Sequence, residues 1–115
     1  MNYVDGFVAA MPQANRAAYL EHAKFAAKVY KEYGALSVVE TWGDDVPEGK
    51  LTSFTMAVKR EENEAVVFSW ITWPSKAARD EAWKKSMEDP RYKDMKMPFD
   101  GKRLIYGGFE VLFSE

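Results

Sequence analysis

Two side chains have the types and settings that proton transfer requires, Asp5 and His22. Asp5 lies in a run of β-forming residues, on the same strand face as Tyr3 and Phe7, where strands disfavour aspartate. If that face is buried, the carboxylate needs a partner or takes a raised pKa, and either state suits an acid, a base or a ligand contact. An ion pair at a sheet edge is the structural alternative. Asp5 is therefore the first catalytic candidate.

His22 is the only histidine, and its side chain has an unperturbed pKa near neutrality. Its helical angle places it near Ala26, at the border of an apolar stripe and away from the lysines. A histidine in this position is either a second catalytic candidate or a packed, hydrogen-bonded residue. Glu40 and Glu110 also lie in predicted strands, and the reasoning for Asp5 applies to both.

Four residues are candidates for binding a ligand. The chain carries four tryptophans, of which Trp42 and Trp70 are candidates for lining an aromatic cavity. Tyr106 precedes two consecutive glycines, which predict either a bulge in the strand or the close approach of a ligand. Arg103 would lie near an anionic group of that ligand. Packing of the tryptophans in the core or in a subunit interface is the alternative.

The composition excludes several kinds of site. Without cysteine there is no disulfide, thiolate nucleophile or thiolate metal site, and a single histidine cannot make a multi-histidine metal centre. The sequence also lacks a phosphate-binding glycine loop, a dinucleotide fingerprint and the H-E-x-x-H and G-x-S-x-G motifs. We therefore expect neither a metal nor a cofactor.

The charge of the chain argues against nucleic acid as a partner. A formal net charge of −2 gives no general attraction to phosphate backbones. One segment, at residues 91–103, is locally basic. It contains five positive residues, Arg91, Lys93, Lys96, Lys102 and Arg103, and two negative residues, Asp94 and Asp100. A solvated loop explains this segment as well as RNA binding does, so an RNA-associated protein is the least favoured function.

The length of 115 residues accommodates one small domain, which we place at residues 1–115. Hydrophobic residues make up 47% of the chain and charged residues 30%, as expected for a compact, soluble protein. No apolar run approaches the roughly 20 residues of a membrane-spanning helix, and the N-terminal residues do not resemble a secretory leader. A cytoplasmic location is expected.

Periodicity and turn residues predict the elements that position these candidates. Strands are predicted at residues 3–11, 36–42, 53–58, 65–73 and 104–113, with 53–58 and 65–73 forming a hairpin. Helices are predicted from an Asn15 cap to Tyr33, ending at Gly34, and from a Ser75 cap to about Glu88. Because each helix links two strands, the order predicts an α+β, ferredoxin-like antiparallel sheet with two helices on one face.

Both faces of the predicted sheet are apolar. In the strand at 65–73, Phe68 and Trp70 alternate with Val67 and Ile71. Two helices cover only one face, and an uncovered second face would exceed the apolar patch of a few hundred Å² that is usual on soluble proteins. We therefore predict a homodimer whose sheets pack face to face.

Five sequence blocks resemble the YbaA-like family of uncharacterised proteins in the dimeric α/β-barrel superfamily. They are YVDGFV at 3–8, WGDDV at 42–46, FSWI at 68–71, WPSKA at 73–77 and MPFDGKRLIYGGF at 97–109. The resemblance implies a dimeric α/β barrel built from ferredoxin-like subunits, with a pocket between the helices and the sheet of each subunit. It implies no particular reaction, since the superfamily includes cofactor-independent monooxygenases, haem-degrading enzymes, isomerases and proteins without demonstrated catalysis.

From the residues and the resemblance together, we expect a protein that binds a small molecule between helices and sheet. A cofactor-independent monooxygenase-like or isomerase-like enzyme is the alternative, in which Asp5 or His22 transfers a proton.

Overall fold

The computed structural model describes residues 2–92 and 96–115 as a four-stranded antiparallel sheet with its two long helices on one face. The strands are β1 (Tyr3–Pro12), β2 (Ser37–Trp42), β3 (Glu64–Trp73) and β4 (Ile105–Glu110), in the order β2-β3-β1-β4. The helices are α1 (Arg16–Glu32), α2 (Phe54–Ala57) and α3 (Lys76–Met87), with 3₁₀ turns at Gln13–Asn15, Pro90–Tyr92 and Gly101–Arg103. The α+β plan is confirmed, and the topology is compatible with a ferredoxin-like fold.

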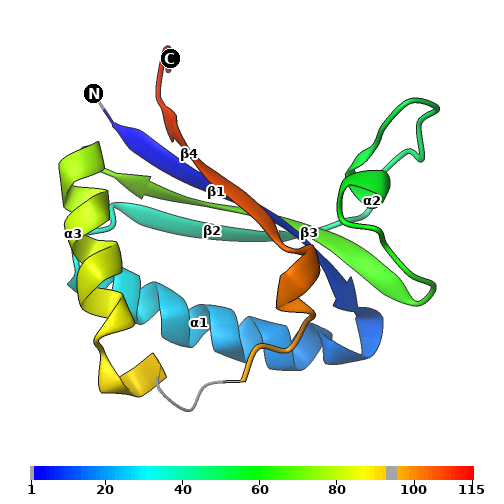
Figure 1. Cartoon of the computed structure of the whole chain (residues 1–115), viewed down its shortest axis with the longest axis horizontal. Helices are drawn as coiled ribbons and strands as arrows, with labels where there is room; N and C mark the ends of the chain where they lie inside the picture. The colour runs from blue at the N-terminus through cyan, green and yellow to red at the C-terminus, as the bar shows by residue number, and fades with distance from the viewer. Residues whose placement is uncertain (1, 93–95) are drawn as a thin grey trace.

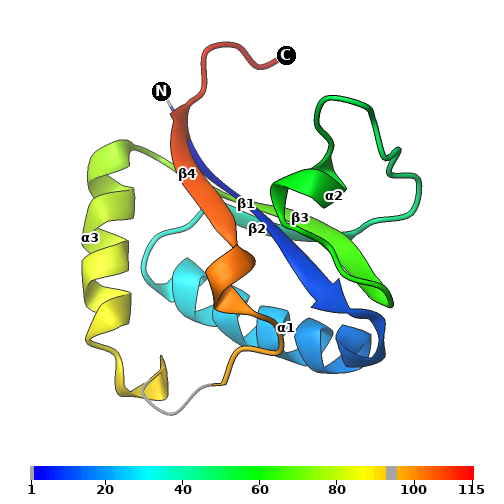
Figure 2. The ribbon, with the colours of Figure 1, turned by 45° about the vertical axis from the view of Figure 1, so that its right-hand side comes forward.

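The two long helices lie together beneath the sheet. Figure 1 shows α1 and α3 on one face, and the turned view in Figure 2 shows the same arrangement. The predicted stripe of α1 faces inward, with Tyr19, Ala23 and Val29 buried. The helix is followed by Gly34, whose φ of 114° lies in the left-handed region that glycine adopts without strain. The predicted buried stripe of this helix and its predicted end at Gly34 are therefore confirmed.

The two predicted helix caps have different outcomes. Ser75 caps α3 as expected, because its hydroxyl accepts a hydrogen bond from the Ala78 backbone N–H at 3.1 Å. Asn15 precedes α1, but its side chain does not cap that helix. It donates instead to the carbonyl of Pro98 at 2.7 Å, and so ties the start of α1 to the segment before β4.

The predicted hairpin strand at residues 53–58 is wrong, because this segment forms the short helix α2. Ser53 accepts a hydrogen bond from the Met56 backbone N–H at 3.0 Å, which stabilises a helical turn. Phe54 packs against Phe68 of β3 with ring centroids 6.0 Å apart. Consequently β2 and β3 pair directly with each other, and the sheet has four strands instead of five.

The final strand is shorter than predicted and contains no bulge. It ends at Glu110, and Leu112 and Phe113 beyond it are 92% and 77% exposed. Its pairing with β1 runs without interruption through Gly107 and Gly108. Gly108 instead allows the side chain of Tyr3 to pack closely against the strand, because a Cβ at this position would lie 2.3 Å from the Tyr3 hydroxyl oxygen.

The strand register separates a covered face of the sheet from an open face. Asp5 of β1 pairs with Ile71 of β3 and with Gly108 of β4, so these three positions point toward the helices. The neighbouring positions of β1, Val4 and Gly6, point to the other side. The predicted alternation is therefore confirmed, and the main core cluster lies on the covered face, built around Tyr3, Ala35, Ile71, Trp73 and Ala82.

The open face is apolar and exposed. Phe68 is 41% exposed, Ile105 44% and Phe109 60%. The ring of Phe109 lies across Gly6 and Gly107, whose missing side chains leave room for it. Figures 1 and 2 show α2 and its flanking loops rising on this side near one end of the sheet, and the C-terminal segment after β4 rising near the other end.

Residues 2–92 and 96–115 include no helix with the length and hydropathy needed to cross a membrane.

We expect Gly108→Ala to destabilise the fold by about 1–3 kcal/mol, the usual range for overpacking a tight site. The added methyl would also lie 2.7 Å from Nη2 of Arg79, whose position is fixed by its ion pair with Asp5. Urea denaturation measures the change. Gly107→Ala is the matched control, because its Cβ meets only the Phe109 ring, at 3.6 Å. Equal stability of the two variants would contradict the close approach at Gly108.

Candidate functional site

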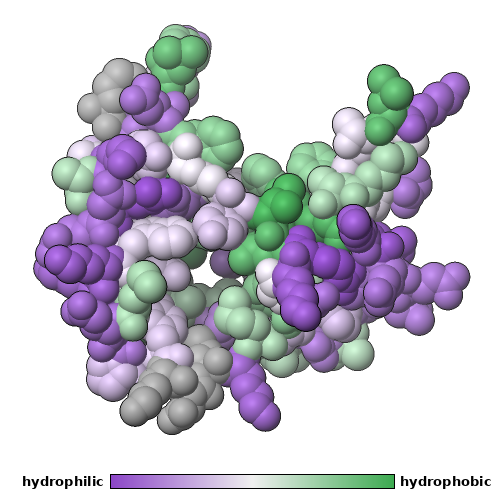
Figure 3. All heavy atoms as spheres, viewed as in Figure 1, coloured by the Kyte–Doolittle hydropathy of each residue, from purple (hydrophilic) through white to green (hydrophobic). Residues whose placement is uncertain are grey.

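A cavity of about 270 Å³ lies between the covered face of the sheet and the two long helices. Figure 3 shows a hollow at the centre of the molecule, above α1 and below the sheet. The helix α1 contributes five lining side chains, Tyr19, His22, Ala23, Ala26 and Tyr30. The small residues in this stripe leave space where larger side chains would fill the core.

The other walls of the cavity are also mainly apolar. The sheet contributes Phe7, Val38 and Ile71, and α3 contributes Trp83. The segment before β4 closes a further side with Met97, Phe99 and Leu104. An apolar hollow with a small number of polar groups is the usual character of a small-molecule site.

Glu40 is the carboxylate on the cavity wall. It lies on the edge strand β2, opposite Ser69 of β3, and the hydroxyl of Tyr19 donates a hydrogen bond to its Oε2. Burial raises the pKa of Glu40 above the ordinary value of 4.5, although the Tyr19 and Ser69 hydroxyls oppose this shift. Burial and the adjacent carboxylate also raise the pKa of Tyr19, so the phenol stays protonated and donates.

His22 lines the same cavity from α1. The side chain is partly buried, and burial lowers its pKa below the usual 6.5. The imidazole is therefore mostly neutral at pH 7, with one nitrogen able to donate and the other able to accept a hydrogen bond. The structure thus brings His22, a sequence-predicted candidate, to the same hollow as Glu40.

A second, more open pocket lies on the outer side of Glu40. Tyr19, Ala23 and Glu40 line both pockets, so the Tyr19–Glu40 pair forms part of the partition between them. Arg16 and Trp42 line only the outer pocket of these two, with the guanidinium 5.1 Å from the centroid of the indole ring. Trp42 is therefore placed at an outer rim and not on the inner cavity.

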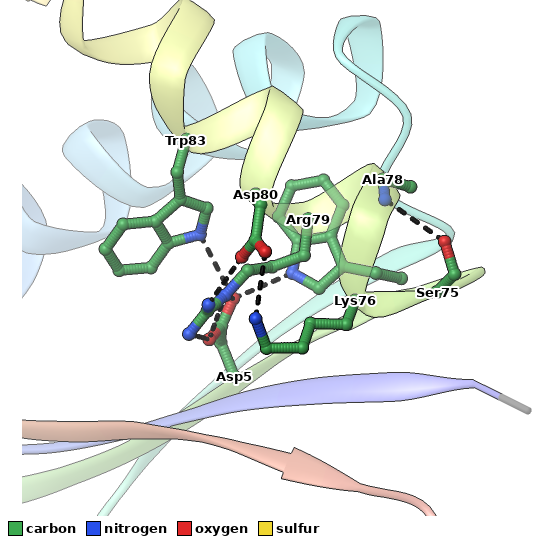
Figure 4. Close-up of polar contacts among 8 residues, drawn as sticks. Asp5, Ser75, Lys76, Ala78, Arg79, Asp80 and Trp83 are labelled. Carbon is green, nitrogen blue, oxygen red and sulfur yellow. Dashed lines mark hydrogen bonds and ion pairs between the residues drawn. The ribbon is translucent and has the colours of Figure 1, made fainter.

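Asp5, the first catalytic candidate, is 1% exposed and makes contacts with three side chains (Figure 4). The Arg79 guanidinium pairs with it at 2.9 Å from Nη2 and 3.0 Å from Nε. The indole N–H groups of Trp73 and Trp83 donate to Oδ2 at 2.8 and 3.1 Å. These bonds attach α3 to β1 and give the carboxylate a structural role beside the cavity.

The remaining ligand-binding candidates lie in three different places. Tyr106 lines the cavity, and its ring centroid is 6.2 Å from that of Trp83. Trp70 belongs to the open face of the sheet. Arg103 forms a two-bonded ion pair with Glu64, at 2.7 and 2.8 Å. Of the candidates considered from the sequence, His22, Tyr106 and Glu40 line the cavity.

The basic segment between Arg91 and Arg103 is partly neutralised by its own contacts. Arg91 pairs with Glu32 and Asp89 at 2.9 and 2.8 Å, and Arg103 is held by the ion pair given above. Lys93 and Asp94 lie outside the described residues. Among those that are described, no group of three histidine or acidic side chains has the arrangement that a metal ion requires.

Sequence reasoning missed Tyr19 and gave Glu40 only the general argument that it shares with Asp5 and Glu110. Tyr19 belongs to the apolar stripe of α1, and nothing in the sequence distinguishes Glu40 from Glu110 as an acid or base. A signal for Glu40 was present, because Val38 and Trp42 share its strand parity and predict an inward-facing position. The partner of Glu40 was not predictable in this way, because it comes from a different element.

We expect Asp5→Asn to lower the free energy of unfolding by about 3 kcal/mol, because it leaves the Arg79 charge without its buried partner. The measurement is urea denaturation followed by circular dichroism. The control is Asp80→Asn, which removes the exposed carboxylate that binds Nη1 of the same guanidinium, and its effect should be much smaller. Loss of catalytic turnover in Asp5→Asn, with an unchanged free energy of unfolding, would instead favour a catalytic role for Asp5.

Comparison with known proteins identifies relatives along the full length of the chain. It is 60% identical to "Uncharacterized protein YbaA" of Escherichia coli strain K12 over 117 residues, covering 100% of each chain. Proteins of that name from Escherichia coli O157:H7 and Shigella flexneri show the same identity and coverage. The resemblance to YbaA-like proteins is thereby confirmed. Residues 2–101 match one family, and the chain therefore belongs to the family described as "Protein of unknown function (DUF1428)".

Proposed function

We propose that this protein binds a small, mainly apolar molecule in the cavity between α1, α3 and the sheet. The observation that carries the proposal is the combination of an apolar hollow of about 270 Å³ with an accessible carboxylate, Glu40, on its wall. Apolar walls supply binding energy, and a small number of polar groups fix the orientation of the ligand.

The size and lining of the cavity define the class of ligand. Its volume is just below the roughly 300–1,000 Å³ of sites for drug-sized molecules, so a ligand of one or two rings is favoured. Tyr30, Trp83 and Tyr106 provide aromatic surfaces for such a ring. Glu40 would accept a hydrogen bond from the ligand, and neutral His22 would donate or accept one.

An enzyme of the cofactor-independent monooxygenase-like or isomerase-like kind is the second candidate. It is favoured by the presence of two groups capable of proton transfer, His22 and Glu40, on one cavity. Catalysis by Asp5 stays a prediction, and its ion pair with Arg79 supports a structural role instead. RNA association has less support, because Arg91 and Arg103 are engaged in ion pairs.

We also propose that two copies associate through their open faces, as in a dimeric α/β barrel. The principal side chains of this surface, Val8, Phe68, Trp70, Ile105 and Phe109, are all uncharged. A second copy presents the same uncharged surface, so a two-fold arrangement buries it without leaving a charge unpaired. The organisation as a single domain and the cytoplasmic location stay predictions.

We expect indazole, a compact two-ring molecule, to bind wild-type protein, and Ala26→Phe to abolish binding by filling the cavity. Ligand-observed saturation-transfer NMR measures the interaction. Ala18→Phe is the matched control, because Ala18 is an exposed residue of the same helix and should leave binding unchanged. Failure of the wild type to bind, or equal binding by Ala26→Phe, would contradict the proposed site.

We expect wild-type protein to have twice the chain mass in native mass spectrometry, and Phe68→Asp to be monomeric. Phe68 is central to an aromatic group on the open face, 5.5 Å from Trp70 by ring centroids, and a carboxylate there would be buried without a partner in the dimer. Met87→Asp, at an 85% exposed position of α3, is the control and should remain dimeric. A monomeric wild type would overturn the proposed association.

A further inference from the structure

We propose that Glu40 is the general base of a cofactor-free proton transfer, acting on a compact, uncharged carbon acid bound in the cavity. The substrate class is a ring-containing ketone or a related molecule whose C–H bond is acidified by a neighbouring electron-withdrawing group. This inference rests on the proposed ligand-binding function, and it adds a reaction type and a residue with a defined role.

The position of Glu40 suits this role. Its side chain reaches the cavity from the edge strand β2, while α1 packs beside it. Tyr19 donates to Oε2 and orients the carboxylate, so Oε1 is the oxygen that a bound substrate would meet. Tyr19 is therefore a positioning residue, acting on the reaction through Glu40.

The surroundings of Glu40 make it a stronger base than a fully solvated carboxylate, although the residue as a whole stays accessible. Tyr19 from α1 and Ser69 from β3 hydrogen-bond to it, while Tyr30 and His22 line the same cavity and Arg16 lines the outer pocket with it. Of these, only Arg16 carries a fixed charge, and it lines the outer pocket. Partial burial raises the pKa of Glu40, which increases the affinity of the ionised carboxylate for a proton.

The proposed step requires no oxidant or reductant. Oε1 of Glu40 takes a proton from carbon, so one C–H bond breaks, one O–H bond forms, and the electron pair moves into an enolate. Return of the proton to a different carbon completes an isomerisation. Because Glu40 also lines the outer pocket, its proton can exchange with water without entering the inner cavity.

The test uses 5-nitrobenzisoxazole, a neutral two-ring carbon acid. A base removes its C3 proton, the N–O bond breaks, and the product is a coloured cyanonitrophenolate. We expect wild-type protein to open this ring at least about 100-fold faster than acetate at the same concentration, in line with general-base catalysis. Glu40→Gln should lose this activity while still binding indazole. Glu110→Gln, an exposed carboxylate on the opposite edge strand, is the matched control and should retain it.

The outcomes separate the two proposals. Indazole binding together with ring opening that depends on Glu40 supports both. Indazole binding without ring opening above the Glu40→Gln level overturns the proton transfer and leaves the binding function standing. Absence of indazole binding by folded wild-type protein overturns the binding function, and the inference with it.

The role of Tyr19 has its own readout in the pH dependence. The rate of ring opening should rise with pH as Glu40 ionises, with an apparent pKa above 4.5. The Tyr19 hydroxyl favours the ionised carboxylate, so Tyr19→Phe should move this rise to higher pH. A merely structural role would change the amplitude of the curve and leave its midpoint in place, which would overturn the assignment of Tyr19 as a positioning residue.

Discussion

The buried carboxylate of Asp5 joins the sheet to α3, and the shape of the cavity depends on this attachment. An almost fully buried charge is tolerated only when it is paired and hydrogen-bonded, and here Arg79 and two indoles meet that requirement. One of those indoles, Trp83, also forms part of the cavity wall. A polar group outside the hollow therefore fixes one of the aromatic surfaces within it. Gly108 completes the arrangement by leaving space beside Tyr3 and Arg79.

Much of the fold was predictable because its signals are local. The stripe on α1, the Ser75 cap and the alternation in β3 depend on residues near one another in the chain. The segment at 53–58 was misassigned for the same reason. Its β-forming residues suggest a strand, but the Ser53 cap and the contact of Phe54 with β3 stabilise a helical turn instead. Tertiary contacts thus overrode local propensity.

The candidate site was less predictable, because its residues come from distant parts of the chain. The sequence indicates that Asp5 needs a partner, but Arg79 lies 74 residues away and is brought near by the packing of α3. The sequence likewise places Glu40 in a strand without indicating that Tyr19, 21 residues earlier, will reach it from α1. His22 and Tyr106 both line the cavity, and this placement was predictable because they lie on elements whose covered faces follow from the sequence pattern.

The four tryptophans occupy four different environments. Trp73 is fully buried in the core, Trp83 lines the cavity, Trp70 lies on the open face, and Trp42 stands under Arg16 at the outer rim. Indole emission shifts to shorter wavelength as water is removed, so each ring reports on its own compartment. Variants that retain one tryptophan at a time would therefore give four optical signals, one each from the core, the cavity wall, the open face and the outer rim, without any attached dye.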